Sequence, residues 1–225
     1  MKVVSTEALT KLIQLVKSAF ISVDDTVETS EVDVYTKNEV DNLTLGGNLY
    51  GNVVVDNEFI CAPYLCWGNK FITSFSAPNC TRAILHGGFT NCSNLTSVNL
   101  SKVEHLNASP GQESYSSDTG IFARSGIVSM DFESLTDLTD INALRYAFAY
   151  SPIQEIWFRA LTSSSFPPST EWYYQDGMGN MLEGCSNVTV HFPSNLQSVI
   201  GSWWVITDGF SGTNTTILFD LPATE

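Results

Sequence analysis

The chain is 225 residues long, 43% hydrophobic and 15% charged, so it can build a folded core and is not a disordered polymer. Its net charge of −14 includes only ten basic residues, which excludes the clustered Lys and Arg that nucleic acids and anionic membrane surfaces require. We therefore expect an acidic, self-repelling surface, with neither nucleic acid nor membrane insertion among its partners.

The first expected element is an amphipathic helix over residues 6–20, which Ser5 can cap and in which Glu7 suits the positive end. A helix of about 15 residues is marginal in isolation, so its apolar stripe needs a partner. Docking onto its own domain and association with copies of itself or a larger assembly both remain open. The stripe consists of Leu9, Leu12, Ile13, Val16, Ala19 and Phe20.

An acidic stretch without periodicity, residues 22–34, reads as a linker. Thr36 and Glu39 then form a capping box that predicts a short helix with Val40 and Leu43 facing inward. We expect residues 1–47 to be a helical attachment or oligomerisation segment. The candidate assembly residues are Leu9, Leu12, Ile13, Val16, Phe20, Val40 and Leu43.

Residues 48–70 predict short strands around 53–55 and 59–60, interrupted by Pro63 and Gly68. We expect this stretch to cap the open end of the repeats that follow, because an end repeat otherwise leaves its apolar face in water.

Apolar residues then recur at offsets 0, 3, 5 and 8 in four copies, a rhythm that resembles leucine-rich repeats. Each unit has an apolar edge that it cannot bury alone, which predicts a mixed β/α solenoid over residues 71–200. We expect Leu100, Phe132 and Phe158 to lie inside on stacked positions. The copies are Ile72, Phe75, Ala77, Cys80; Leu95, Val98, Leu100, Val103; Ile127, Met130, Phe132, Leu135; and Ile153, Ile156, Phe158, Leu161.

An aromatic or Leu precedes each later unit, followed three positions on by Cys or Ser. The instances are Phe89-Thr-Asn-Cys92, Phe122-Ala-Arg-Ser125, Phe148-Ala-Tyr-Ser151 and Leu182-Glu-Gly-Cys185. Cys92 and Cys185 are therefore expected to be small, buried, reduced thiols in the wall of the repeat, since five irregularly spaced cysteines fit neither a disulfide framework nor a zinc site. The core offsets fail after Val188.

Two insertions, residues 109–119 and 163–177, follow the last core position of a unit and precede the next leading Phe or Leu. They should emerge on one edge of the solenoid. The second contains aromatics that the repeat does not demand, and such rings either cover a repeat end or bind a ligand. The candidate binding edge comprises Tyr115, Trp172, Tyr173 and Tyr174.

The tail predicts a short helix over 194–200, stopped by Gly201, and a strand through 217–219, so that residues 201–225 form a C-terminal cap. Trp203 and Trp204 are expected in the core of this cap.

Catalytic and metal-binding patterns do not stand out in the sequence. His86, His105 and His191 are far apart, and none has a paired-ligand spacing; His191 alternates with Val190 and Phe192, which predicts a solvent-facing position on a strand. Asp137 and Asp140 would bind calcium only with further convergent oxygens. We expect no enzyme activity, no metal and no cofactor.

Two resemblances suggest a function. The string Tyr35-Thr-Lys-Asn-Glu-Val-Asp-Asn-Leu43, with the opening Lys2-Val-Val-Ser-Thr-Glu-Ala-Leu-Thr-Lys-Leu12, resembles the N-terminal region of phage tail-fibre and related virion proteins. The Phe-x-x-Cys/Ser pattern followed by Asn-Leu or Ile, as in Cys92-Ser-Asn-Leu95, resembles BspA-like leucine-rich repeats of bacterial surface and phage proteins.

Together the resemblances imply a virion structural and receptor-binding protein, a homotrimer attached to other virion proteins that recognises a host-surface glycan or protein. The start of the chain has no apolar h-region or small-residue cleavage site, so synthesis in the cytoplasm is expected, and the resemblance implies location in the virion. A BspA-like bacterial adhesion module and a fibre-borne glycan depolymerase are the alternatives.

Overall fold

The computed structural model describes part of the second of two units into which the chain divides, Thr36–Glu225. The described residues are 49–61, 63–107, 116, 118–140, 142–166, 180–200 and 214–224. The expected N-terminal helices, their assembly residues and the Trp203-Trp204 pair lie outside these ranges.

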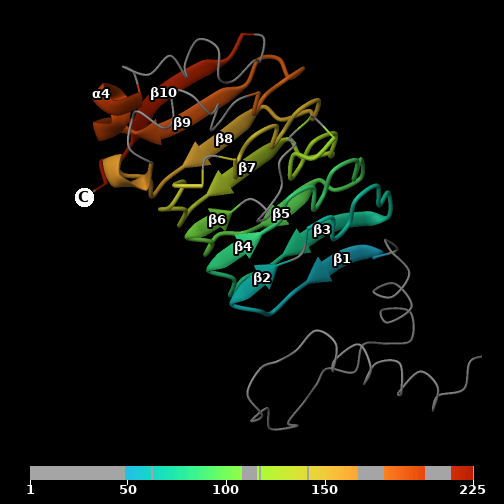
Figure 1. Ribbon diagram of the computed structural model, residues 1–225. Helices are drawn as coiled ribbons and strands as arrows, with labels where there is room; N and C mark the ends of the chain where they lie inside the picture. Colours follow the sequence, from blue (N-terminus) through green and yellow to red (C-terminus); the bar gives the residue numbers. More distant parts are fainter. Residues whose placement is uncertain are drawn as a thin grey trace, which may run out of the picture. The chain divides into compact units, whose positions relative to one another are not determined.

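The described residues form a mostly parallel β-solenoid of about six turns (Figure 1). Strands of successive turns lie side by side, with β1 and β2 at one end and β9 and β10 at the other (Figure 1). The strands are β1 (Gly51–Val54), β2 (Phe59–Cys61), β3 (Ile72–Ser76), β4 (Arg82–Ile84), β5 (Ser97–Asn99), β6 (His105–Asn107), β7 (Ser129–Phe132), β8 (Glu155–Phe158), β9 (Thr189–Pro193) and β10 (Thr216–Leu221).

The strands belong to three sheets, and the strand register follows the repeat. Sheets β1-β3-β5 and β7-β8-β9-β10 form what we call the strand wall, and β2-β4-β6 forms a second wall. In the first sheet Phe75 pairs with Val98, and in the second Met130 pairs with Ile156 and Ile156 with Val190. Phe75, Val98, Met130 and Ile156 all occupy offset 3 of their repeats, and Val190 occupies the equivalent position in the next turn. The sequence spacing therefore sets the register.

A third wall, which we call the turn wall, consists of consecutive β-turns instead of strands. In the turn that begins at Gly87, the Thr90 amide donates to Gly87 and the Cys92 amide donates to Phe89. The same two bonds recur at 64–69, 120–125, 146–151 and 180–185. Hydrogen bonds also join neighbouring turns, as from Phe148 N to Met181 O at 2.9 Å, so the backbone groups of this wall are paired without a helix.

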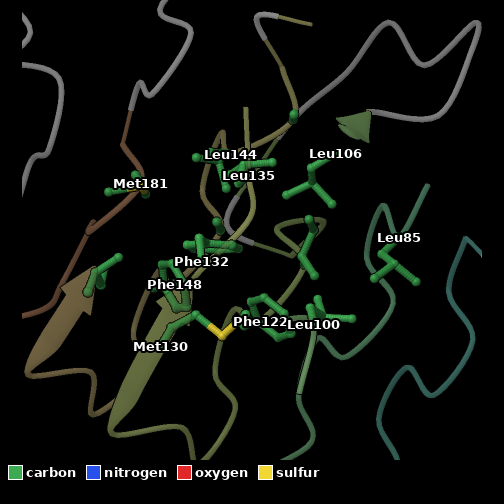
Figure 2. Packing of buried hydrophobic residues seen from close by; sticks show 14 of the residues in the cluster. Leu85, Leu100, Leu106, Phe122, Met130, Phe132, Leu135, Leu144, Phe148 and Met181 are labelled. Carbon is green, nitrogen blue, oxygen red and sulfur yellow. The ribbon is translucent and has the colours of Figure 1, made fainter. Parts of the chain in front are cut away.

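Stacked phenylalanines fill the interior. On the strand wall, the ring centroids of Phe132 and Phe158 are 5.1 Å apart and those of Phe158 and Phe192 are 5.2 Å apart. On the turn wall, Phe122 lies 5.6 Å from Phe89 and 5.4 Å from Phe148. Figure 2 shows Phe122, Phe132 and Phe148 directed into the same core. Leu100, Phe132 and Phe158 are at most 1% exposed, which confirms their predicted interior positions.

Helix is scarce in the described residues, so the expected mixed β/α repeat is wrong in its helical part. The helical elements there are the 3-10 helices η1 (Ser163–Ser165) and η2 (Ser194–Leu196) and the α-helix α4 (Gln197–Ile200). The physical reason is the short path across the turn wall: two β-turns complete it and satisfy the backbone, leaving no length for a helix. The expected helix over 194–200 is confirmed as η2 followed by α4.

The two expected caps contribute strands to the same walls as the repeats. At the start, β1 pairs with β3 and β2 with β4, both in parallel, so residues 49–70 make one further turn of the solenoid. At the end, β10 pairs with β9 in parallel, with Ile217 opposite Val190. The repeat therefore continues past Val188, where the sequence offsets fail. A search of the described helices for a stretch long and apolar enough to span a membrane finds none.

Candidate functional site

The residues proposed from sequence for the host-binding edge, Tyr115 and Trp172-Tyr173-Tyr174, lie outside the described residues. Their flanking residues are described and show where each insertion leaves the solenoid and where it returns. The second insertion leaves later than expected, because Ser163–Ser165 forms η1 and both Ser165 and Phe166 are buried.

Both insertions leave from equivalent positions of the second wall. Leu106 in β6 is one residue beyond His105, which bridges Asp137 in parallel, so Leu106 corresponds to Leu138. The Leu138 amide donates to Ser165 O at 2.8 Å, so Leu138 in turn corresponds to Phe166. The insertions after Leu106 and after Phe166 thus start at the same phase, meaning at equivalent positions in their turns of the solenoid.

Both insertions also return at the same phase of the turn wall. Gly120 and Asn180 occupy equivalent first positions of their β-turns, and Tyr146 occupies this position in the turn between them. Connections from the second wall to the turn wall span residues 61–63, 84–86, 107–119, 139–145 and 167–179. A shorter connection, with its Tyr146 turn, therefore lies between the two longest ones.

The turn wall carries bulky residues in the left-handed conformation. Within its β-turns, φ is positive at Tyr64, Arg124, Tyr146 and Tyr150, with values from 53° to 58°. Such angles suit Gly or Asn, and for bulky residues they are uncommon and cost about 1–3 kcal/mol each. Backbone strain of this kind clusters at functional sites, which directs attention to the two turns that begin at Gly120 and Tyr146.

Arg124 and Tyr150 occupy the same position in neighbouring turns and stack on each other. The Arg124 guanidinium carbon lies 4.9 Å from the Tyr150 ring centroid, and Arg124 also forms an ion pair with Asp118. The Tyr150 hydroxyl lies 2.8 Å from a carboxylate oxygen of Glu183, and this hydrogen bond raises the pKa of the phenol. The phenol thus stays a donor, and about half of the residue remains exposed.

A glycine in the next turn makes room for the Tyr150 ring. A Cβ atom at Gly184 would lie 2.3 Å from the ring, so a larger residue there would displace Tyr150. Beside it, the Tyr146 hydroxyl accepts a hydrogen bond from the Asn180 amide at 2.9 Å, and Arg145 approaches the Tyr146 ring with its guanidinium carbon 5.8 Å from the centroid. We call Arg124, Tyr146, Tyr150, Asn180 and Glu183 the tyrosine surface.

Sequence reasoning missed the tyrosine surface, although a signal was present. In the Phe-x-x-Cys/Ser motif, the third residue is Asn91 in one copy and Gly184 in another, two types that tolerate positive φ. Arg124 and Tyr150 at this third place were therefore identifiable as bulky residues in a left-handed position. An arginine stacked on a tyrosine, with carboxylates and an amide around them, can bind polar ligands through ring faces and hydrogen bonds.

On the strand wall, His191 points outward but is not the solvent-facing residue expected from its alternation. Its side chain is 13% exposed because the ring stacks on Trp157, with centroids 5.3 Å apart. Nδ1 donates to Asp220 at 3.0 Å, and within the described chain the buried Nε2 has no hydrogen-bond partner. A carboxylate-supported histidine acts as a general base when its second nitrogen reaches a nucleophile.

The other polar groups singled out in the sequence have structural partners. Asp137, considered for calcium, lies 2.8 Å from His105 Nδ1 and accepts hydrogen bonds from the amide and hydroxyl of Thr139. Cys92 and Cys185 are buried free thiols, as predicted. Burial raises the pKa of Cys92 to about 12, which disfavours the nucleophilic thiolate form. No group of three or more metal-ligating side chains is found within the described ranges.

Searches against protein families, curated proteins and solved structures found no match to this chain.

Proposed function

We propose that the chain is a structural and receptor-binding protein of a phage virion, a tail-fibre or accessory-fibre protein. In this proposal, the solenoid presents a recognition surface to the host cell. The N-terminal residues attach the chain to other virion proteins and associate it into a homotrimer. The assignment to a virion is based on the resemblance of residues 2–12 and 35–43 to phage fibre proteins.

One observation carries the recognition part of the proposal: both long insertions leave and return at the same phase, on either side of the Tyr146 turn. Loops that share a phase lie along one edge of a solenoid, and in repeat arrays such edges carry binding function. The tyrosine surface lies at the return point of these insertions. Exposed rings, arginine and amide groups are the side chains that anchor recognition interfaces.

The BspA-like identity of the repeats is supported by the Phe motif and its packing. Phe89, Phe122 and Phe148 are fully buried and stack in order, and the Cys or Ser three positions later is buried in each case. The BspA-like bacterial adhesion module remains the alternative, because the same surface would serve it. Tail or capsid genes beside the coding gene favour the virion, and sortase or secretion genes favour the adhesion module.

Assembly through the N-terminal segment is supported by the end of the solenoid at which that segment enters. Tyr50, Phe59, Trp67 and Phe71 on this first turn are each 50–55% exposed, and the Tyr50 and Phe71 rings lie 4.9 Å apart. Within the described chain, β1 and β2 are edge strands with one partner each. Open edges and clustered exposed rings are typical of surfaces that are covered in an assembly.

The recognition proposal is tested by replacing Trp172, Tyr173 and Tyr174 together with Ala and measuring attachment of the full chain to host cells. We expect attachment to weaken by about 1–3 kcal/mol if even one ring is an anchor. Val128→Ala trims an exposed apolar side chain outside the first turn, the insertions and the tyrosine surface, and is the matched control. Unchanged attachment together with a large fall in melting temperature would show that the rings cover the fold instead.

The assembly proposal is tested by light scattering of the full chain at micromolar concentration, which should give the mass of three chains. Leu12→Asp with Val16→Asp places charges on the predicted helix stripe and should yield a folded monomer, as should deletion of residues 1–45. Ser18→Asp adds a charge to the same helix off the stripe and should remain trimeric. A monomeric parent chain that also binds no virion protein would contradict the proposal.

A further inference from the structure

Between two neighbouring turns, beside the tyrosine surface, lies a pocket of about 420 Å³. Residues 151–154 form one side of it and residues 184–187 the other. The turns are joined at both ends of the pocket, by the Tyr150 amide to Glu183 O and by the Thr189 amide to Gln154 O, each at 2.7 Å. The backbone is therefore tied on either side of the space, which keeps the pocket in a fixed place.

The pocket exists because the repeat changes at Asn187. The register Ile156–Val190 places Asn187 opposite Ile153, the buried leading residue of its own unit. Asn187 is instead exposed and left-handed at φ 58°, and Val188 takes the buried position one residue later. At this level the later turn therefore presents the Asn187 amide to the pocket instead of an apolar side chain to the core.

The lining of the pocket is polar and uncharged. Gln154 and Ser186 are exposed, and their side chains make no hydrogen bond within the described chain. The Asn187 side-chain oxygen accepts a hydrogen bond from Asn214 at 3.3 Å, which orients the amide and leaves its NH₂ group for a ligand. Pro152 adds an apolar surface, and the Tyr150 ring lies over Gly184 at the rim.

Resting on the proposed recognition function, we propose that this pocket binds a neutral sugar residue of a host-surface glycan. Amide and hydroxyl groups match sugar hydroxyls, and the exposed Pro152 ring matches the apolar side of a pyranose ring. The volume falls within the range of small-ligand sites. No Lys or Arg lines the pocket, and the net charge of −14 disfavours anionic sugars.

The test is saturation-transfer NMR on the full chain with the methyl glycosides of glucose, galactose, N-acetylglucosamine, N-acetylgalactosamine and rhamnose. The methyl glycoside of sialic acid is the anionic arm. We expect transfer to at least one neutral glycoside and none to the sialoside. Gln154→Ala, and Asn187→Gly, which keeps the left-handed backbone, should each weaken binding about two- to tenfold, the effect of one lost hydrogen bond.

Thr96→Ala is the matched control, because Thr96 follows Leu95 as Gln154 follows Ile153 but lies on a turn without the pocket. It should leave binding unchanged, and thermal melting should confirm that all three variants are folded. Absence of transfer to every neutral glycoside, transfer to the sialoside alone, or binding unaffected by both pocket variants would overturn the assignment. If the parent chain still attaches to host cells in any of those cases, the recognition function stands and the pocket alone is rejected.

Discussion

On the strand wall, Phe132, Phe158 and Phe192 stack at centroid distances of 5.1 and 5.2 Å, so one residue type recurs at one interior position. Each six-residue stretch of the turn wall has a left-handed residue at its fifth position, and the residue type there differs between successive stretches. Successive turns carry Gly68, Asn91, Arg124, Tyr150 and Gly184. The interior phenylalanines and the left-handed residues each recur once per turn of the solenoid.

The difference shows what each place requires of its residue. An interior position must fill the same volume at each level, because protein cores are close-packed and a smaller side chain leaves a cavity. A left-handed surface position requires only that the residue tolerate positive φ, and its side chain extends into solvent or over the next turn. Chemical variety therefore accumulates on the turn wall, where we place recognition.

The largest effect should follow from breaking the interior series. Phe158→Ala removes a ring that is fully buried between Phe132 and Phe192, and we expect a loss of about 3–5 kcal/mol in the free energy of unfolding. Denaturant unfolding of the full chain measures it. Glu155→Ala, on the exposed face of the same strand, should change stability by less than about 0.5 kcal/mol. Equal losses in the two variants would contradict the stacked core.

A smaller effect should separate backbone strain from ring packing on the turn wall. Gly68→Ala and Gly184→Ala both place a Cβ at φ 72°, which costs about 1–2 kcal/mol. At Gly68 nothing lies within 4 Å of that Cβ, whereas at Gly184 the Tyr150 ring lies 2.3 Å away. Gly184→Ala should therefore be the more destabilising of the two in denaturant unfolding.

The additional loss of unfolding free energy in Gly184→Ala, compared with Gly68→Ala, should disappear when Tyr150 is also replaced by Ala, because the ring that the new Cβ displaces is then absent. A double-mutant cycle measures this coupling. If the cycle shows no coupling, the ring does not lie over Gly184.

The smallest effect should come from the partly exposed hydrogen bond between Asp137 and His105. Partial burial acts to raise the pKa of Asp137, but hydrogen bonds from Thr139 and the adjacent His105 hold it below its ordinary value. Asp137→Asn should cost less than about 1 kcal/mol at neutral pH, since the pair is partly solvated.

The pH dependence of that loss has a defined sign. A lowered folded-state pKa stabilises the fold above the ordinary carboxyl pKa of 3.8, and the stabilisation is lost as the pH falls through the folded-state value. Unfolding curves of parent and Asp137→Asn chains should therefore converge in acid. A difference that grows as the pH falls would contradict the assignment.

The core could be predicted from the sequence because burial demands apolar residues at fixed spacing. The offsets identified the interior positions of four units, and the Phe motif identified the second stacked series. The offsets failed at the later turn because its leading buried residue is shifted by one position. The strand register places Asn187 opposite the buried Ile153, but Asn187 is exposed and Val188 is buried instead.

The candidate site was predictable only in part. Its insertions were visible as extra length, and their common phase follows from the repeat. The stacking of Arg124 on Tyr150 was not visible, since it depends on two left-handed residues from turns that are distant in sequence. Equally, nothing local marks Trp157 as a cover for His191, which turned an expected solvent-facing histidine into a largely buried one.

By itself, the sequence determined a repeating solenoid and the residues inside it, because spacing along the chain controls which side chains must be buried together. Only the tertiary structure decided that the third wall is built of β-turns, that its tyrosines and arginine stack across levels, and that a pocket opens where Asn187 faces out. These features depend on contacts between neighbouring turns, whose residues lie some 20 to 35 positions apart in the chain, as Arg124 and Tyr150 do. Spacing alone does not specify how such side chains meet.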